Sequence, residues 1–456
     1  MSVVYRQKGF LEYMKKFDRD KYLKKLKFKR NLTKYGKYFY IGVPCVLAVV
    51  AGIYFAYSKF TVSKDAEVVK TTVGKFIHGD VVIGAYINGE YSNTIPGKND
   101  GCVVEKIVCD NDVSASWNND AWGIVLTNLT KRTKCNVYFK IDPIKKIIAQ
   151  LDTSGKCPTI NSDGTVNVTK AEATDGYICS AADAYGTSYY YRGNVTNNYV
   201  KYAGFYWRII RINGDGTIRM IYGGTKAYEN GIASDDIQIG TSTFNNNSDD
   251  NAYVGYMYGK AGASTYAETH ANINNSTIKT YIDTWYENNI KGTTNEKYIV
   301  DNIFCNDRSF SSSNSGTGTG KSYTKYNWAY WHPSKTSLKC PQQNDAFTVS
   351  DTIYGNGALT YPVGLLSTDE VVLAGNWNDF SGFSYLQIGS YWWTSSPAYA
   401  GDAAYVHILT SGGDANYIDD SVSWPDLGVR PVLNVTKEVL QNGNGTIDNP
   451  YTLSVQ

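Results

Sequence analysis

The side chains best suited to metal binding or covalent chemistry in this chain are its cysteines and histidines. There are eight cysteines and four histidines among 456 residues. No two cysteines form a CxxC motif, and no histidine lies at ligand spacing from a cysteine or from another histidine. Structural zinc sites need four such ligands close together. The sequence therefore predicts no zinc site.

Signature motifs of known catalytic sites are absent from the sequence. It contains no HExxH, GxSxG, P-loop or Rossmann glycine pattern. A carboxylate pair for glycoside hydrolysis has no fixed spacing and stays open as an alternative. A single histidine in a strand, such as His407, is more typical of a structural role than of acid–base catalysis. We therefore expect a protein that is not an enzyme.

The segment 245–251 (NNNSDDN) is the best calcium candidate, because Asp249 and Asp250 offer carboxylate oxygens. A solvated loop explains the same composition and is the preferred interpretation. Calcium thus stays an alternative, and no cofactor is expected.

The composition favours molecular recognition. The chain has 39 Tyr and 10 Trp, together with abundant Asn, Ser and Gly. Binding loops use the same residues, because tyrosine gives a large amphipathic contact at low entropy cost. The alternative is that a Tyr-rich β-protein has this composition without binding anything.

Strand alternation near the C-terminus indicates where a ligand would bind. In the segment 403–409, alternation directs Val406 and Ile408 to the core, so Tyr405 and His407 face outward. The same pattern, with residues of adjoining loops, completes a predicted ligand-binding patch made of Tyr399, Asp402, Tyr405, His407, Tyr417, Asp419 and Trp424.

The cysteines after residue 100 are expected to form disulfides in an oxidising exterior. The preferred pairs are Cys109–Cys135, Cys157–Cys179 and Cys305–Cys340, which leaves Cys102 free. Each pair closes a loop of about 20–35 residues, worth ~3–4 kcal/mol in loop-entropy models. Sequence cannot fix connectivity, and a Cys102–Cys109 bridge with Cys135 free is a competing arrangement.

A run of 20 uncharged residues, 38–57, is long enough to cross a membrane as a helix. The preceding residues 1–37 contain 13 Lys and Arg but only 3 Asp and Glu, which predicts a cytoplasmic N-terminus and extracellular C-terminal domains. We expect a single-pass cell-membrane protein that contacts membrane lipid through residues 11–57. A cleaved signal peptide and a buried core helix are the alternatives, and no nucleic-acid partner is expected.

The chain is expected to be α+β, with a transmembrane helix, a small β-sandwich and a larger mixed domain. The large domain should contain a hairpin (199–212 with 217–224), a helix at 276–290, and a helix that begins with a Ser367/Glu370 capping box. The predicted parts are a basic head (1–37), the transmembrane helix (38–57), a stalk (58–70), the β-sandwich (71–140), a linker helix (141–155) and the mixed domain (156–456).

The order of these elements, followed by YWWTSSP at 391–397 and LGVRPV at 427–432, resembles the C-type-lectin-like fold of bacterial surface proteins. Formylglycine-generating enzymes and the variable proteins of diversity-generating retroelements share that fold. The resemblance covers residues 156–456 and is most evident over 360–440. The plan is also similar to that of membrane-anchored proteins of gut Firmicutes.

Two departures limit what the resemblance implies. Formylglycine-generating enzymes hold copper with a cysteine pair near the end of the domain, but this chain has no cysteine after Cys340. Trp377-Asn378-Asp379 matches one element of calcium-dependent lectins, but the accompanying Glu-Pro-Asn or Gln-Pro-Asp is missing. Neither the copper chemistry nor the calcium site is therefore expected here.

The sequence thus predicts a surface protein that binds an extracellular glycan or protein through its C-type-lectin-like domain. A structural envelope component that holds protein partners near the membrane is the first alternative. An extracellular hydrolase is the second.

Overall fold

The computed structural model of the protein describes residues 69–71, 81–127, 132–169, 175–327, 333–376, 384–409 and 419–453. Two compact units divide this part of the chain. The N-terminal unit contains the described residues up to 95 together with 104–139. The C-terminal unit contains residues 96–103 and the described residues from 140 onward.

Two small β-sheets form the N-terminal unit. Their strands are β1 (Val69–Thr71), β2 (Val81–Ile87), β3 (Glu90–Ser92), β4 (Cys102–Cys109), β5 (Ser114–Asn118), β6 (Gly123–Thr127) and β7 (Thr133–Ile141). One sheet has the order β1-β6-β5 and the other β3-β2-β7-β4. The Trp117 ring of β5 contacts the Phe139 ring of β7 edge to face, with centroids 5.3 Å apart. Aromatic contacts therefore connect the two sheets.

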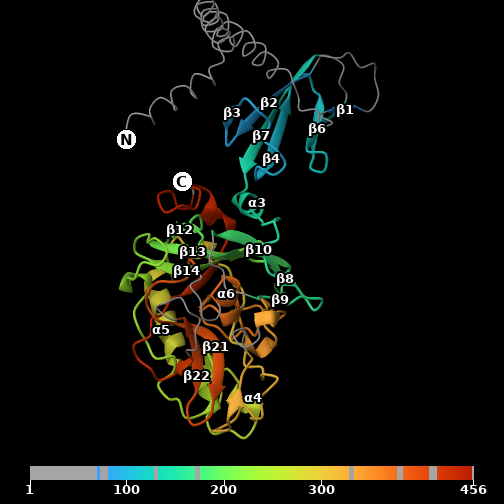
Figure 1. Ribbon diagram of the computed structural model, residues 1–456. Helices are drawn as coiled ribbons and strands as arrows, with labels where there is room; N and C mark the ends of the chain where they lie inside the picture. The colour runs from blue at the N-terminus through green and yellow to red at the C-terminus, as the bar shows by residue number, and fades with distance from the viewer. Residues whose placement is uncertain are drawn as a thin grey trace, which may run out of the picture. The chain divides into compact units, whose positions relative to one another are not determined.

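The largest sheet described in the C-terminal unit has seven strands, and we call it the central sheet; its strands β10, β12, β13 and β14 are labelled in Figure 1. Its strands are β10 (Tyr177–Ala182), β11 (Thr187–Arg192), β12 (Tyr199–Tyr202), β13 (Phe205–Ile212), β14 (Ile218–Gly224), β20 (Val363–Gly364) and β24 (Val432–Val435). The order is β10-β11-β13-β14-β24-β20, and β12 pairs with β13. Every residue of β14 is buried. This strand is therefore covered on both faces, which is why its sequence shows no alternation of apolar and polar residues.

The predicted strand 199–212 is in fact two strands. β12 and β13 form a tight hairpin, because Ala203 (φ 52°) and Gly204 (φ 84°) both adopt the left-handed backbone conformation. That combination is typical of the type I′ turn. Alanine carries no turn signal at such a position, so the sequence pattern missed it. The next turn, predicted at 213–216, is present, and Asn213 N–H donates to Thr217 O at 2.8 Å.

A second sheet has the order β18-β21-β22-β23. Its strands are β18 (Thr324–Lys325), β21 (Trp392–Ala400), β22 (Tyr405–Leu409) and β23 (Asp419–Ser421). Three two-stranded pairs join β8 (Thr159–Ile160) to β9 (Val166–Asn167), β15 (Met257–Tyr258) to β16 (Asn274–Asn275), and β17 (Phe304–Cys305) to β19 (Ala346–Phe347). One hydrophobic core contains side chains of both larger sheets, including Trp207 of β13 and Trp392 of β21.

The described chain has four short α-helices, namely α3 (Pro143–Ile148), α4 (Tyr266–Thr269), α5 (Thr277–Asn289) and α6 (Thr368–Leu373). α5 agrees with the helix predicted at 276–290, and it buries Ile278, Ile282 and Tyr286. α6 begins with the predicted capping box, in which Ser367 and Glu370 each accept the other's backbone N–H. Local sequence signals therefore located both helices correctly.

The expected α+β class is wrong, because the described residues are rich in β-structure and contain few helices. Side-chain-to-backbone hydrogen bonds hold many of the loops between strands, and such bonds compete with helix formation. The Asp301 carboxylate, for example, accepts the backbone N–H groups of Val349, Ser350 and Asp351 at 2.7–3.1 Å. A chain rich in Asn, Asp, Ser and Gly favours such loops over helices.

In the described residues, no helix combines the length and the apolar character that crossing a membrane requires. The predicted head (1–37) and transmembrane helix (38–57) lie outside these residues. So does the predicted stalk (58–70), except for its last two residues, which belong to β1.

All three preferred cysteine pairs are disulfides in the structure: Cys109–Cys135, Cys157–Cys179 and Cys305–Cys340. Cys102 is a buried free thiol, and burial, with a smaller contribution from Asp100, raises its pKa. Three disulfides indicate an extracellular or secreted protein.

A buried ion-pair cluster of four side chains joins α6 to the central sheet. Arg211 Nη1 of β13 lies 2.8 Å from Asp183 Oδ2, and Arg211 Nε lies 3.2 Å from Glu370 Oε1 of α6. Arg219 Nε of β14 lies 2.5 Å from the same Glu370 oxygen. None of the four side chains is more than 6% exposed. Two positive and two negative charges therefore neutralise one another out of contact with water.

We expect Glu370→Gln to lower the free energy of unfolding by about 3–5 kcal/mol, because two buried guanidinium groups lose their shared carboxylate. Urea denaturation followed by tryptophan fluorescence measures the change. Asp249→Asn is the matched control, since Asp249 pairs with Lys321 at 3.7 Å with both side chains more than 60% exposed. That change should cost less than about 1 kcal/mol. Equal losses in the two variants would contradict a stabilising role for the cluster.

Candidate functional site

The C-terminal unit contains a cavity of about 550 Å³ beside the ion-pair cluster. Small-molecule sites in proteins have volumes of about 300–1,000 Å³. Most of the residues that line it are polar, although apolar atoms form the larger part of its surface. Its charged and aromatic members are Arg211, Arg219, Asp307, Phe310, Lys335, Lys339, Asp369 and Glu370. We call it the carboxylate cavity, after Asp307 and Asp369.

A disulfide holds two walls of this cavity together. Cys305 ends β17 and lines the cavity, and its partner Cys340 is flanked by two further lining residues, Lys339 and Pro341. The segment around Cys340 carries no strand of its own. The covalent link therefore fixes the Lys339 side of the cavity against the sheet side.

Asp307 lies two residues after Cys305 and is 8% exposed. Its Oδ1 accepts hydrogen bonds from Ser309 N (2.9 Å) and Ser309 Oγ (2.5 Å), and Asn327 Nδ2 donates to Oδ2 at 3.3 Å. Desolvation raises the pKa of this carboxyl to about 6, although the Ser309 hydrogen bonds oppose the shift.

Asp369 is half-buried in the first turn of α6, next to Glu370 of the ion-pair cluster. Ser337 N–H donates to its Oδ1 at 2.7 Å. Desolvation, with smaller contributions from the negative charges of Asp307 and Glu370, raises the pKa of Asp369 to about 7, although the Ser337 hydrogen bond opposes the shift. At neutral pH this carboxyl therefore exists in both its protonated and its ionised forms, so it can donate or accept a hydrogen bond.

Exposed side chains add other contacts to the lining. Lys335 and Lys339 are exposed and offer ammonium donors, and the Phe310 ring is 42% exposed. Serine hydroxyls of residues 312, 334 and 337 line the same space. Carboxylates, ammonium groups, hydroxyls and an aromatic face together suit a ligand with many hydroxyl groups and apolar C–H faces.

Two residues of the predicted patch lie together in the second sheet. Tyr399 of β21 and Tyr405 of β22 are half-buried and stacked, with ring centroids 4.4 Å apart. Tyr323, which precedes β18 and is 55% exposed, lies 6.0 Å from Tyr399 between ring centroids. We call Tyr323, Tyr399 and Tyr405 the aromatic strip. The sequence analysis missed Tyr323, because nothing local shows that β18 pairs with β21.

The predicted outward position of His407 is wrong. His407 is 5% exposed, and its neighbours Val406 and Ile408 are buried as well. Alternating residues indicate an exposed face only when one face of the sheet is open to solvent. Both faces of β22 are covered, so the alternation there gives no such information. Burial lowers the pKa of His407 to about 3, so the ring is neutral at physiological pH.

The other patch residues are not brought to one place by the described contacts. Asp402 and Trp424 are exposed, Trp424 by 51%. Asp419 is opposite His407 in the β22–β23 register, but its side chain is not described. Tyr417 lies outside the described residues.

The segment 245–251 uses its carboxylates internally. Asp250 Oδ1 accepts Ala252 N–H and Oδ2 accepts Gly262 N–H, while Asp249 forms the surface pair with Lys321. Among the described residues, no group of three or more His, Cys, Asp or Glu is placed to hold a metal ion. Trp377-Asn378-Asp379 lies outside them.

The sequence analysis did not single out Asp307 or Asp369. Residues as far apart as Thr165 and Glu370 line the carboxylate cavity, and no local spacing reveals such an assembly. A weak signal was available, since Asp369 lies inside the recognised capping box and Asp307 lies two residues after a predicted disulfide cysteine.

Asp369→Asn should remove a pH-dependent loss of stability. The pKa of Asp369 is raised on folding, so the wild type loses stability as the pH rises from the ordinary Asp value of about 4 to about 7. We expect the stability of Asp369→Asn relative to wild type to increase from pH 4 to pH 8, measured by urea denaturation. Asn keeps an oxygen for the Ser337 N–H bond.

The exposed Asp402→Asn is the matched control and should show no such trend. If the difference in unfolding free energy between Asp369→Asn and wild type stayed constant over this pH range, folding would not raise the pKa of Asp369.

Comparison with known proteins gives no match: no family model, no curated protein and no solved structure matches this chain. The function therefore has to be argued from the geometry of the carboxylate cavity and the aromatic strip.

Proposed function

We propose that this extracellular or secreted protein binds carbohydrate, and that the carboxylate cavity is the sugar-binding site. The observation that carries the proposal is the cavity itself, in which three carboxyls, two lysines and one aromatic ring surround about 550 Å³. We therefore propose the glycan binding that the sequence predicted, but at this cavity and not at the predicted patch near the C-terminus.

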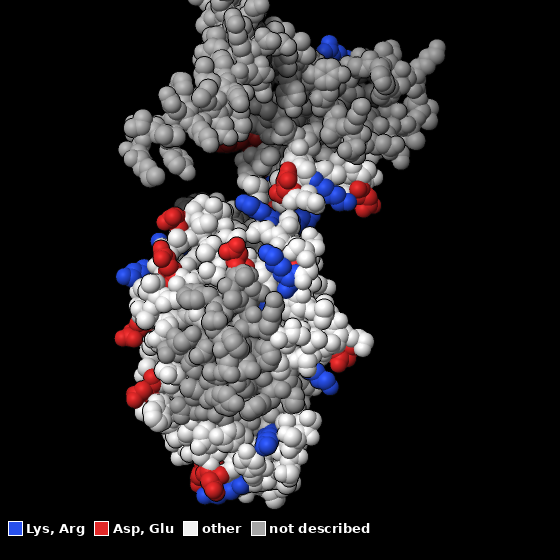
Figure 2. Space-filling model, in the orientation of Figure 1, with Lys and Arg blue, Asp and Glu red and all other residues white. Residues whose placement is uncertain are grey.

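The chemistry of a sugar ring matches this lining. Sugar hydroxyls both donate and accept hydrogen bonds. They can therefore donate to Asp307 and Asp369 when these are ionised and accept from them when they are protonated. Lys335 and Lys339 donate to ring or hydroxyl oxygens, and the C–H face of a sugar packs on an aromatic ring such as Phe310. A polyanion is a poorer match, because Lys, Arg, Asp and Glu are interspersed on the described surface in Figure 2.

The aromatic strip supports the same ligand class. Tyr323 and the stacked pair Tyr399–Tyr405 form an amphipathic row of rings, which suits a second sugar unit of an extended glycan.

Glycoside hydrolysis is a second candidate function, favoured by the raised pKa values of Asp307 (about 6) and Asp369 (about 7) in one cavity. Glycosidases use one protonated carboxyl as general acid and a second carboxylate as base or nucleophile. Asp369, with the higher pKa, would protonate the glycosidic oxygen, and Asp307 would be the second carboxylate.

A glycan-array screen with the full-length chain, purified in mild detergent under oxidising conditions, tests the proposed binding. Asp307→Asn and Lys339→Ala should each weaken binding of a hit about tenfold or more, because each removes a charge-assisted hydrogen bond. Asp402→Asn and Lys260→Ala are the matched controls, since both residues are exposed and neither lines the cavity. Loss of binding in Tyr405→Ala, with the cavity variants unchanged, would instead place the site on the aromatic strip.

The same glycan hits test hydrolysis, by the release of new reducing ends. If the cavity hydrolyses its ligand, Asp369→Asn should abolish turnover while retaining binding, because the proton donor is lost but the amide still forms hydrogen bonds. Binding without turnover by the wild type would leave the protein as a carbohydrate-binding protein.

A further inference from the structure

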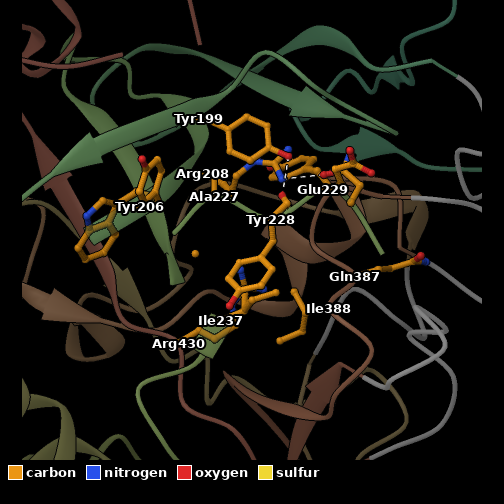
Figure 3. Close-up of a pocket in the computed structure, with 14 residues that line it drawn as sticks. Tyr199, Tyr206, Arg208, Ala227, Tyr228, Glu229, Ile237, Gln387, Ile388 and Arg430 are labelled. Atoms are coloured by element: carbon orange, nitrogen blue, oxygen red, sulfur yellow. Dashed lines mark hydrogen bonds between the residues drawn. The ribbon is translucent and has the colours of Figure 1, made fainter. Parts of the chain in front are cut away.

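A smaller pocket in the C-terminal unit is built around two buried arginines (Figure 3). Arg208 belongs to β13, and Arg430 lies two residues before β24. They are 6% and 1% exposed. The pocket has a volume of about 20 Å³, and no residue of the carboxylate cavity lines it.

Neutral acceptors surround Arg208. Its Nε donates to Asn198 Oδ1 (2.7 Å), Nη1 to Asn230 Oδ1 (2.6 Å) and Nη2 to Val195 O (2.7 Å). A guanidinium carries five N–H groups. Three are used in these bonds, so the described residues leave two available.

Backbone carbonyl oxygens accept the hydrogen bonds of Arg430 in the same way. Its Nε and Nη2 donate to Tyr222 O at 3.1 and 2.9 Å, and Nη1 donates to Leu386 O at 3.2 Å. The described residues likewise leave two of its five N–H groups available.

Within the described chain, no carboxylate lies within the 4.0 Å ion-pair distance of Arg208 or Arg430. Desolvation lowers the pKa of Arg208 to about 10, and desolvation together with the charge of Arg208 lowers the pKa of Arg430 to about 9. A buried cation without a counter-charge is strongly unfavourable. The pocket therefore favours an anion.

Tyr385 supplies a further unused donor. Its side chain is 2% exposed, and its hydroxyl has no hydrogen-bond partner in the described part of the chain. The Arg208 guanidinium carbon lies 5.3 Å from the centre of the Tyr385 ring. Burial raises the pKa of Tyr385, the charge of Glu370 adds to this effect, and the charges of Arg208 and Arg430 oppose it. Tyr385 therefore lies beside Arg208, and among the described residues its hydroxyl has no acceptor.

We propose that this pocket binds one small monovalent anion of halide size, such as chloride, held by Arg208, Arg430 and the Tyr385 hydroxyl. A volume of about 20 Å³ admits about one water-sized species, which excludes phosphate, sulfate and sugar acids. The exposed Glu229, which also lines the pocket, disfavours more highly charged anions. The bound anion neutralises the site where β13 meets the chain leading into β24. The proposal does not rest on carbohydrate binding.

Thermal unfolding of the full-length chain in detergent tests this proposal, with chloride varied between about 1 and 200 mM and gluconate keeping the ionic strength constant. The Tm of the wild type should rise by about 4 °C at a hundredfold excess of chloride over its Kd. Bromide should act like chloride, whereas acetate should not. Tyr385→Phe should raise the Kd for chloride about tenfold or more, because one hydrogen bond to the ion is lost.

Tyr190→Phe is the matched control, because Tyr190 is also 2% exposed and its hydroxyl has no hydrogen-bond partner among the described residues, but it does not line this pocket. Its chloride dependence should equal that of the wild type. A crystal soaked in bromide should show an anomalous peak between the two arginines, independently of any variant. No chloride dependence, an equal response to acetate, or no bromide peak would each overturn the assignment.

Discussion

The C-terminal unit depends on one electrostatic constraint, the neutralisation of Arg211 and Arg219 inside the protein. Both guanidinium groups lie on neighbouring central strands, where water is excluded. Glu370 reaches both, so the start of α6 must lie directly against β13 and β14. Asp183, in the turn after β10, supplies the second negative charge of the cluster and also accepts the backbone N–H of Gly214. One set of charges therefore fixes a helix, two strands and two turns relative to one another.

The protein uses buried arginines in two ways. Arg211, Arg219 and also Arg308, which pairs with Asp345 at 2.6 Å, have carboxylate partners that remove their net charge. Arg208 and Arg430 are surrounded by amide and carbonyl oxygens, which satisfy hydrogen bonds but leave the charge. The first arrangement stabilises packing between elements, whereas the second leaves a positive potential in a small pocket.

Local signals in the sequence predicted local structure well. The capping box of α6 and the turn at 213–216 are present, because each depends on residues near one another in the chain. The three preferred disulfides are present as well. The hairpin at Ala203 and the burial of His407 were missed, since one depends on an unusual backbone conformation and the other on what covers a strand. The α+β class failed because the expected helices within the described residues are short and few, so strands and hydrogen-bonded loops make up most of that part of the chain.

Sequence patterns could not predict the pKa values of the carboxyls in the carboxylate cavity. Glu370 and Asp369 are adjacent and both desolvated, yet their pKa values shift in opposite directions. For Glu370, Arg219 and Arg211 outweigh desolvation and hold the pKa below its ordinary value. Because these arginines are committed to Glu370 and Asp183, they leave Asp369 without a compensating cation, and the charge of Glu370 raises its pKa further. The same cluster that fixes α6 against the sheet thereby produces the carboxyl that titrates near neutral pH.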